Sequence, residues 1–214
     1  MKTANFDGLA TFYRALEYIV FGRDLERARF CLLDRLAGCR SILILGEGDG
    51  RCLERLVRIA PQARIHCLDA SGAMLAKARA RIAGTEAAPR VTFQQADARD
   101  VTLPDSVYDA VVTLFFLDCF THPQLNLLVP RIAHSLRPQA HWLFADFALP
   151  PRGLPRLRAR VWLAVLYWFF RWRTGLAARA LPPSEPQIES AGFRVAAERS
   201  RQQGLLRSVG FERQ

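Results

Sequence analysis

Two kinds of residue in this chain have types and spacing that could hold a small ligand: glycines in a short loop, and carboxylates that follow apolar runs. The loop spans residues 46–50 and reads G-E-G-D-G. Glycines let a backbone turn tightly and approach a ligand closely. Helical spacing begins directly afterwards, at Arg51, and the first turn of a helix leaves backbone N–H groups available. The loop favours a nucleotide-like ligand, although a plain turn between strand and helix also uses glycines.

The first carboxylate in a suitable position is Asp69, which follows the apolar run at residues 63–68. It lies about 20 residues beyond the loop, where a carboxylate can accept hydrogen bonds from both hydroxyls of a ribose. The alternative role is that of a turn or helix-capping aspartate. Asp97, Asp118 and Asp146 follow later apolar runs. We expect all of these acids at the C-terminal ends of strands two to five, where open α/β sheets bind ligands.

The elements that must position these residues alternate between strand and helix patterns. Residues 42–45 are apolar without a polar break, which is typical of a strand buried on both faces of a parallel sheet. Ser71 is a typical N-cap residue and precedes a helical pattern. We expect strands at residues 42–45, 63–68, 91–95, 108–114 and 141–145, and helices at residues 51–59, 72–82 and 124–136.

The end of the chain departs from this alternation. Residues 193–198 and 205–211 are strand-like runs on either side of a turn at residues 203–204. They predict a C-terminal hairpin whose last strand joins the sheet antiparallel. The complete pattern predicts an α/β fold with a Rossmann-like, doubly wound sheet of about seven strands. We divide the chain into an N-terminal helical cap at residues 1–38 and an α/β domain at residues 39–214, with a helix inserted around residues 154–181.

Residues 6–36 of the cap show helical spacing, and Gly22 divides them into two helices. Packing against the core is the favoured role for this cap. The alternative is a lid in which the hydroxyl of Tyr13 or Tyr18 reaches the ligand.

The composition narrows the class of protein. The chain has 214 residues and a formal net charge of +10, carried almost entirely by arginine. Such a charge is compatible with nucleic acid, an anionic membrane surface or an anionic substrate, and also with a basic solvated surface. Five scattered cysteines without a C-x-x-C motif favour a reducing cytosol, and the histidines lack metal-ligand spacing. We expect a cytoplasmic protein with no metal site and no signal peptide.

Five motifs in order make the chain resemble the class I S-adenosylmethionine-dependent methyltransferases over residues 41–211. The motifs are I-L-I-L-G-E-G-D-G-R, I-H-C-L-D-A-S, Q-Q-A-D-A, Y-D-A-V-V-T-L-F-F-L-D and the G-F-R-V hairpin. The resemblance implies S-adenosylmethionine as the cofactor. The contacts that it implies are Gly46, Gly48 and Gly50 for the methionine part, Asp69 for the ribose diol, Asp97 and the N–H of Ala98 for adenine, Ala70 and Met74 beside the adenine ring, Leu114 and Phe115 around the sulfonium, and Tyr18 from the cap.

One position departs from the family pattern. The family often has an acid two residues before the first glycine of the loop, and Ile44 stands there in this chain. Glu47, inside the loop, is therefore the expected partner of the cofactor's ammonium group, directly or through water.

Methyl transfer from a sulfonium is an in-line displacement, for which a protein mainly supplies alignment and a dry site. A general base is needed only when the acceptor must lose a proton. The candidates are Asp118 and His122, followed by Asp146. Each also has a structural alternative, which is helix capping for Asp118 and His122 and a loop hydrogen bond for Asp146.

The sequence after the fourth predicted strand bears on the acceptor. Residues 114–118 read L-F-F-L-D, without the N/D-P-P-Y/F motif common in enzymes that methylate amino groups of nucleic-acid bases. This resembles small-molecule methyltransferases, including those of quinone biosynthesis, so we expect a small, apolar or aromatic acceptor. The alternatives are an RNA or protein methyltransferase, or a non-catalytic S-adenosylmethionine-binding partner protein. An NAD-dependent enzyme fits least, because the glycine spacing is wrong for it.

Residues 155–181 combine six arginines with an apolar, aromatic run at residues 161–170, and no acid occurs between Asp146 and Glu185. The run is about half as long as a membrane span requires. We expect a helix packed on the sheet, with two alternatives. The helix could form a lid over the substrate, or residues 156–173 could contact an anionic membrane and make the protein peripheral there.

Overall fold

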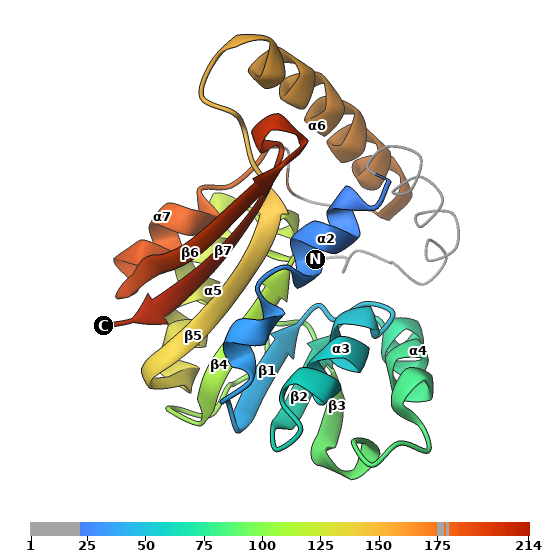
Figure 1. Cartoon of the computed structure of the whole chain (residues 1–214). Helices are drawn as coiled ribbons and strands as arrows, with labels where there is room; N and C mark the ends of the chain where they lie inside the picture. The colour runs from blue at the N-terminus through green and yellow to red at the C-terminus, as the bar shows by residue number, and fades with distance from the viewer. Residues whose placement is uncertain (1–21, 175–177, 179) are drawn as a thin grey trace.

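A seven-stranded sheet forms the centre of the protein (Figure 1), and the computed structural model describes residues 22–174, 178 and 180–214. The strand order is β3-β2-β1-β4-β5-β7-β6. Strand β7 runs antiparallel to both of its neighbours, whereas the other pairs are parallel. The predicted doubly wound sheet with an antiparallel last strand is thus confirmed. The strands are β1 Ser41–Leu45, β2 Arg64–Asp69, β3 Val91–Gln95, β4 Tyr108–Leu114, β5 Leu136–Phe147, β6 Phe193–Arg201 and β7 Leu206–Arg213.

Strand β1 is central, as its unbroken apolar run predicts. Residues 42–45 are all buried, and Ile44 lies between Cys67 of β2 and Val112 of β4. A strand with a neighbour on each side and helices on both faces has no polar surroundings, so only apolar side chains are stable there.

Helices cover both faces of the sheet (Figure 1). Helices α3 and α4 and the short helix η1 share one core cluster, and α5 and α7 share the cluster on the opposite face. Helices α2 and α6 form a third cluster with the first residues of β7. The helices are α2 Asp24–Phe30, α3 Arg51–Ile59, α4 Gly72–Ile82, α5 His122–Ser135, α6 Gly153–Thr174 and α7 Ser184–Ser190, with 3-10 helices η1 Leu33–Leu36, η2 Ala88–Arg90, η3 Leu117–Cys119 and η4 Gln202–Gly204.

Three elements differ from the sequence expectation. Strand β5 begins at Leu136 and not at residue 141. Residues 137–139 belong to the strand although they lack an apolar pattern. Helix α5 begins at His122, where the N–H of Thr121 donates to Oε1 of Gln124 at 2.8 Å. Helix α7 was not predicted, because Ile188 is its one buried apolar residue and gives no periodicity.

The described part of the predicted cap packs against the sheet. Gly22 has a φ of +56°, and α2 begins two residues later. The hydroxyl of Ser208 in β7 donates to the carbonyl of Ala28 at 2.7 Å, and Glu26 of α2 pairs with Arg55 of α3 at 3.2 Å. The predicted packing role therefore holds for these residues, whereas Tyr13 and Tyr18 lie outside the described residues.

Candidate functional site

The glycine loop joins β1 to α3, and each of its glycines has a left-handed backbone. The φ angles of Gly46, Gly48 and Gly50 are +70°, +68° and +88°. A Cβ atom on Gly46 would lie 2.4 Å from the ring of Phe116, and one on Gly50 would lie 2.5 Å from Cα of Ala78. Packing therefore accounts for glycine at positions 46 and 50. A Cβ on Gly48 would meet no atom within 4 Å, so Gly48 is the glycine at which a ligand can approach the backbone.

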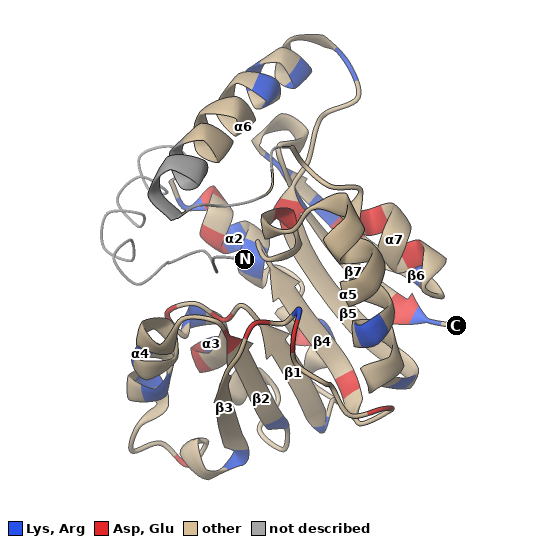
Figure 2. Ribbon diagram, turned by 180° about the vertical axis from the view of Figure 1, so that it is seen from behind, with Lys and Arg blue, Asp and Glu red and all other residues tan. Residues whose placement is uncertain are grey.

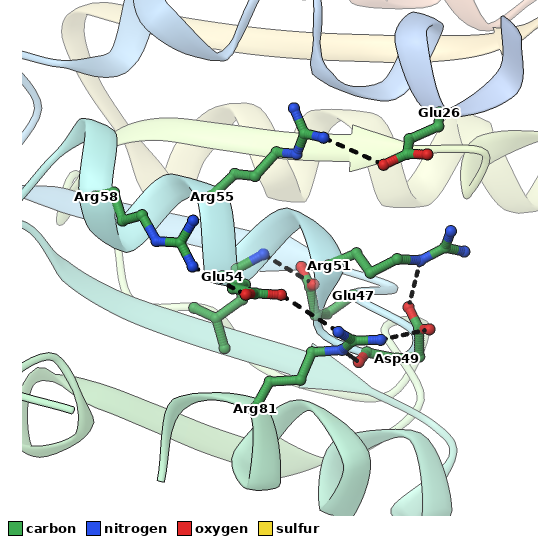
Figure 3. Close-up of polar contacts among 9 residues, drawn as sticks. Glu26, Glu47, Asp49, Arg51, Glu54, Arg55, Arg58 and Arg81 are labelled. Atoms are coloured by element: carbon green, nitrogen blue, oxygen red, sulfur yellow. Dashed lines mark hydrogen bonds and ion pairs between the residues drawn. The ribbon is translucent and has the colours of Figure 1, made fainter. Parts of the chain in front are cut away.

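Arginine–carboxylate pairs fasten this loop to α4 (Figure 3). Asp49 pairs with Arg51 at 3.0 Å and with Arg81 at 3.1 Å. Nε of Arg81 also donates to the carbonyl of Asp49, and its Nη1 lies 3.2 Å from Glu54, which in turn pairs with Arg58. The sequence did not reveal this network, because Arg81 lies 32 residues from Asp49. The network holds the loop in place before any ligand binds.

Glu47 is buried within the loop, with 8% of its surface exposed. Its Oε1 accepts a hydrogen bond from the N–H of Leu53 in the first turn of α3, at 2.9 Å. Its Oε2 is buried and has no hydrogen-bond partner among the described residues. The pKa of this carboxyl is raised from 4.5 to about 8, mainly by burial, with smaller increases from the charges of Asp49 and Asp69 and decreases from the N–H groups of Leu53 and Cys52. An unpartnered carboxyl oxygen at this place fits a cationic group on a ligand.

Asp69 ends β2 and lies across from the loop. Its Oδ2 accepts from the N–H of Gly48 at 3.1 Å, and its Oδ1 accepts from the N–H of Ser71 at 2.9 Å. The hydroxyl of Ser71 accepts from the N–H of Met74 and caps α4, as predicted. Asp69 therefore makes the turn contact considered from the sequence. Its side chain is only partly buried, and each carboxylate oxygen can accept a second hydrogen bond, so a ribose diol fits it as well.

Asp97 follows β3 and is held by a residue that the sequence interpretation missed. Nε of Arg99 lies 2.9 Å from Oδ1 of Asp97, and its Nη2 lies 2.5 Å from Oδ2. The hydrogen bonds from Arg99 lower the pKa of Asp97. Arg99 thus donates to both oxygens of Asp97 and would share them with an adenine amino group. The sequence feature that could have indicated this ion pair is the basic residue two positions after the acid.

The other predicted cofactor contacts occupy the same edge of the sheet. Ala70 is exposed and Met74 is partly exposed between β2 and α4, while Ala98 is buried after β3. Leu114 ends β4, and Phe115 follows it with a φ of +54°. A left-handed backbone is uncommon for an aromatic residue. The Phe115 ring lies under the guanidinium of Arg29, 5.2 Å away, and packs edge-on against Phe147.

Two carboxyl groups meet where β4 and β5 end. Oδ2 of Asp146 accepts from the N–H of Asp118 at 3.0 Å, and Oδ1 accepts from the N–H of Phe147 at 2.9 Å. The carboxyl group of Asp146 is buried and that of Asp118 is half-buried, and the charge of Asp118 acts on Asp146. Burial raises the pKa of Asp118 to about 6, and burial together with the Asp118 charge raises that of Asp146 well above its usual value. Such a pair shares a proton.

The surroundings of this pair come from distant parts of the chain. The thiol of Cys119 donates to Oδ1 of Asp118 at 3.6 Å, and the hydroxyl of Tyr167 in α6 donates to the Asp118 carbonyl at 3.3 Å. The charge of Arg29 in α2 lowers the pKa of Asp118. The sequence interpretation missed Tyr167, because it stands in an apolar run and resembles a core residue.

His122 is placed differently from Asp118 and Asp146. It is the first residue of α5, is exposed, and makes no hydrogen bond to either acid in the part of the chain that the structure describes. Thr121 stands at the N-cap of α5. Asp118 therefore does not cap this helix, and the structure brings Asp118 together with Asp146 but not with His122.

Comparison with known proteins agrees with the fold and the loop. Residues 42–139 match a family model described as a methyltransferase domain. The chain is 36% identical over 126 residues to the trans-aconitate 2-methyltransferase of Methylobacterium nodulans, a match that covers 58% of this chain and 45% of the relative. It is 33% identical over 115 residues to the demethylmenaquinone methyltransferase of Clavibacter sepedonicus, covering 54% of this chain and 44% of the relative. The chain thus spans about half the length of these curated relatives.

Solved structures show the same architecture. An O-methyltransferase family protein from Burkholderia thailandensis matches with a TM-score of 0.71 at 18% identity, covering 97% of this chain and 57% of that chain. At this identity the likeness concerns the fold alone.

Proposed function

We propose that this chain, which is similar to methyltransferases over residues 42–139, is a class I S-adenosylmethionine-dependent methyltransferase that transfers a methyl group to a small, apolar or aromatic acceptor. One observation carries the proposal. The loop with Glu47 and Gly48 and the carboxyl pair of Asp118 and Asp146 lie at the C-terminal ends of the adjacent strands β1, β4 and β5. Phe116, which stands two residues before Asp118, packs its ring against Gly46 of the loop.

Residues of the loop and of β2 would hold the cofactor, whose sulfonium supplies an activated methyl group. Asp69 would accept hydrogen bonds from the ribose hydroxyls, and the open backbone at Gly48 would admit the methionine part. The unpartnered Oε2 of Glu47 would accept from the ammonium group. Adenine would lie beside Ala70 and Met74, and its amino group would compete with Arg99 for Asp97.

The carboxyl pair would receive the proton of an acceptor that carries one. Asp118 has a pKa of about 6, whereas Asp146 has a pKa well above its usual value. Near neutral pH, Asp118 is ionised and can act as the base, and its charge favours the protonated form of Asp146. As the acceptor would bond to the methyl carbon and the bond from that carbon to the sulfonium sulfur would break, the acceptor's proton would pass to Asp118. The rings of Phe115, Phe147 and Tyr167 around the pair favour an apolar or aromatic acceptor.

The alternatives considered from the sequence gain no support. The two relatives described above are named for small acceptors, and neither name refers to RNA or protein. A non-catalytic binding protein would not need a buried acid, Asp146, whose charged form is disfavoured by the neighbouring Asp118.

Calorimetric titration with S-adenosylmethionine tests whether the protein binds the proposed cofactor. We expect micromolar binding that Asp69→Ala abolishes and that Asp105→Ala, at an exposed aspartate before β4, leaves unchanged. A folded protein that binds neither S-adenosylmethionine nor S-adenosylhomocysteine would refute the proposal.

A methyl-transfer assay with the labelled cofactor tests the proposed class of acceptor. The assay would offer small phenols, quinols and apolar carboxylic acids, with total RNA and a protein extract as competing acceptors. We expect label in at least one small acceptor. Label confined to RNA or protein would overturn the assignment to small molecules.

A further inference from the structure

The outer face of helix α6 carries an exposed apolar stripe. Leu154, Leu157, Val161, Val165 and Trp168 have exposed fractions of 81%, 60%, 57%, 50% and 68%. At 3.6 residues per turn these side chains fall within an arc of about 80°. They make up five of the nine large apolar residues that are exposed in the described part of the chain. Exposed apolar side chains concentrated on one helix indicate a contact surface.

The opposite face of α6 is packed against the protein, so the stripe is not a sign of a misplaced helix. Ala159, Leu163, Leu166 and Tyr167 are buried against α2 and the first residues of β7. Tyr167 also donates its hydroxyl to the carbonyl of Asp118. Helix α6 is thus anchored on one side and presents the stripe on the other. Figure 1 shows the helix beyond one end of the sheet.

Positive charge surrounds the stripe. Arg152, Arg156, Arg158 and Arg160 are exposed, and none of them pairs with a carboxylate among the residues that the structure describes. Arg156 donates to the carbonyl of Pro150, and Arg158 donates to Oε1 of Gln202. Figure 2 shows basic and no acidic residues on α6, in agreement with its sequence.

We propose that this face of α6, with its apolar stripe and flanking arginines, docks the protein onto an anionic lipid surface. A basic helix with a tryptophan and aliphatic residues on one side can lie in the plane of a membrane, with its arginines at the level of the phosphates. The charge disfavours a second copy of the chain as the occupant, because paired α6 helices would bring arginines together without a carboxylate between them. Within the described residues, no helix is long and apolar enough to cross a membrane.

The inference does not depend on methyl transfer, because its readout is binding to vesicles. The full chain would be floated with vesicles of phosphatidylcholine alone, and with vesicles enriched in phosphatidylserine, at low and high salt. We expect binding to the anionic vesicles at low salt, and its loss at high salt, since exposed charges are screened there. Brominated lipids should quench tryptophan fluorescence on binding.

Matched substitutions locate the contact. Leu157→Gln should weaken vesicle binding about tenfold, whereas Leu127→Gln, at an equally exposed leucine of α5, should not. Arg160→Gln should weaken it about fivefold, and Arg194→Gln, on β6, should not. All four side chains are exposed, so unchanged thermal unfolding serves as the folding control.

Three results would overturn the proposal. The first is no flotation with anionic vesicles at low salt. The second is equal weakening by Leu157→Gln and Leu127→Gln. The third is a dimer, measured by light scattering, that Leu157→Gln dissociates while vesicle binding is absent, which would assign the stripe to a second copy of the chain.

Discussion

Replacing Glu47 by glutamine should stabilise the fold at neutral pH and weaken cofactor binding. The carboxyl group is buried, Oε1 accepts from the N–H of Leu53, and Oε2 has no partner among the described residues. Burial raises its pKa from 4.5 to about 8. Glutamine keeps an oxygen for Leu53 but carries no charge. The variant therefore removes one ionisable group with little change in the shape of the side chain.

The direction of the effect depends on which state holds the proton. Below pH 4.5 the carboxyl is protonated in both the folded and the unfolded state. Between pH 4.5 and about 8 the unfolded state loses the proton and the folded state keeps it, so the free energy of unfolding falls as the pH rises. Each pH unit is worth about 1.4 kcal/mol. The loss accumulated by pH 7 is about 3 kcal/mol at most, and relaxation around the ionised group reduces it to about 1–3 kcal/mol.

Urea unfolding at about pH 5 and about pH 7.5 measures this difference. We expect similar stabilities of the two proteins at the lower pH, and a more stable Glu47→Gln variant at the higher pH. Glu86→Gln, at an exposed glutamate, is the matched control and should change neither value. A Glu47→Gln variant no more stable than the wild type at about pH 7.5 would refute the reasoning.

The same variant tests the proposed ammonium contact. If the ammonium draws Glu47 into its charged form, binding of S-adenosylmethionine at neutral pH releases a proton. Titrations in two buffers with different ionisation enthalpies measure this release. We expect it for the wild type, and weaker binding without the release for Glu47→Gln. Equal affinity of the two proteins would remove Glu47 from the cofactor contacts.

Three further predictions concern other residues of the site. Asp118→Asn should lower the rate of methyl transfer about 100-fold or more with unchanged cofactor affinity. The wild-type rate should rise with pH through about 6 as Asp118 ionises. A pH-independent rate would contradict the role of Asp118 as the base. Arg99→Gln should free Asp97 and tighten cofactor binding, measured by calorimetry. The loss of stability should stay below about 1 kcal/mol, because the ion pair is partly exposed. Weaker binding would place Arg99 among the cofactor contacts. Gly50→Ala should destabilise the fold by more than about 2 kcal/mol in urea unfolding, since backbone strain and a clash with Ala78 combine. Gly48→Ala should cost about 1 kcal/mol of stability and mainly weaken cofactor binding. Equal losses of stability would contradict the different roles of the two glycines.

The parts of the fold that could be predicted from the sequence are those set by local pattern. The unbroken apolar run of β1, the glycines after it and the cap residue Ser71 each determine structure within a few residues. The position of Asp69 was predictable for the same reason, because a strand end and a loop spacing define it. The lengthening of β5 was not predictable, since Leu136 pairs with Tyr108 of β4 across an irregularity in the register and residues 137–139 lack an apolar pattern.

The parts of the site that escaped prediction depend on contacts between distant residues. Tyr167 reaches Asp118 across 49 positions, and Arg81 reaches Asp49 across 32. Neither residue differs in sequence from an ordinary core tyrosine or surface arginine. The pairing of Asp118 with Asp146 required the order of β4 and β5 in the sheet, which places both acids at one edge but does not determine that they share a proton.

The direction of the pKa shift separates two groups of acids along the sheet. One group accepts from arginine or backbone N–H groups and has lowered pKa values: Asp49, Asp97 and Asp109. The other group is buried with raised pKa values: Glu47, Asp118 and Asp146. Acids of the first kind stabilise the fold at neutral pH, whereas those of the second kind destabilise it. Apolar side chains of similar size would avoid that loss. Glu185 of α7 also has a raised pKa, but it pairs with Arg207. Glu47, Asp118 and Asp146 lie at the C-terminal ends of β1, β4 and β5, where a cofactor and an acceptor would meet, so their destabilising placement supports a chemical role.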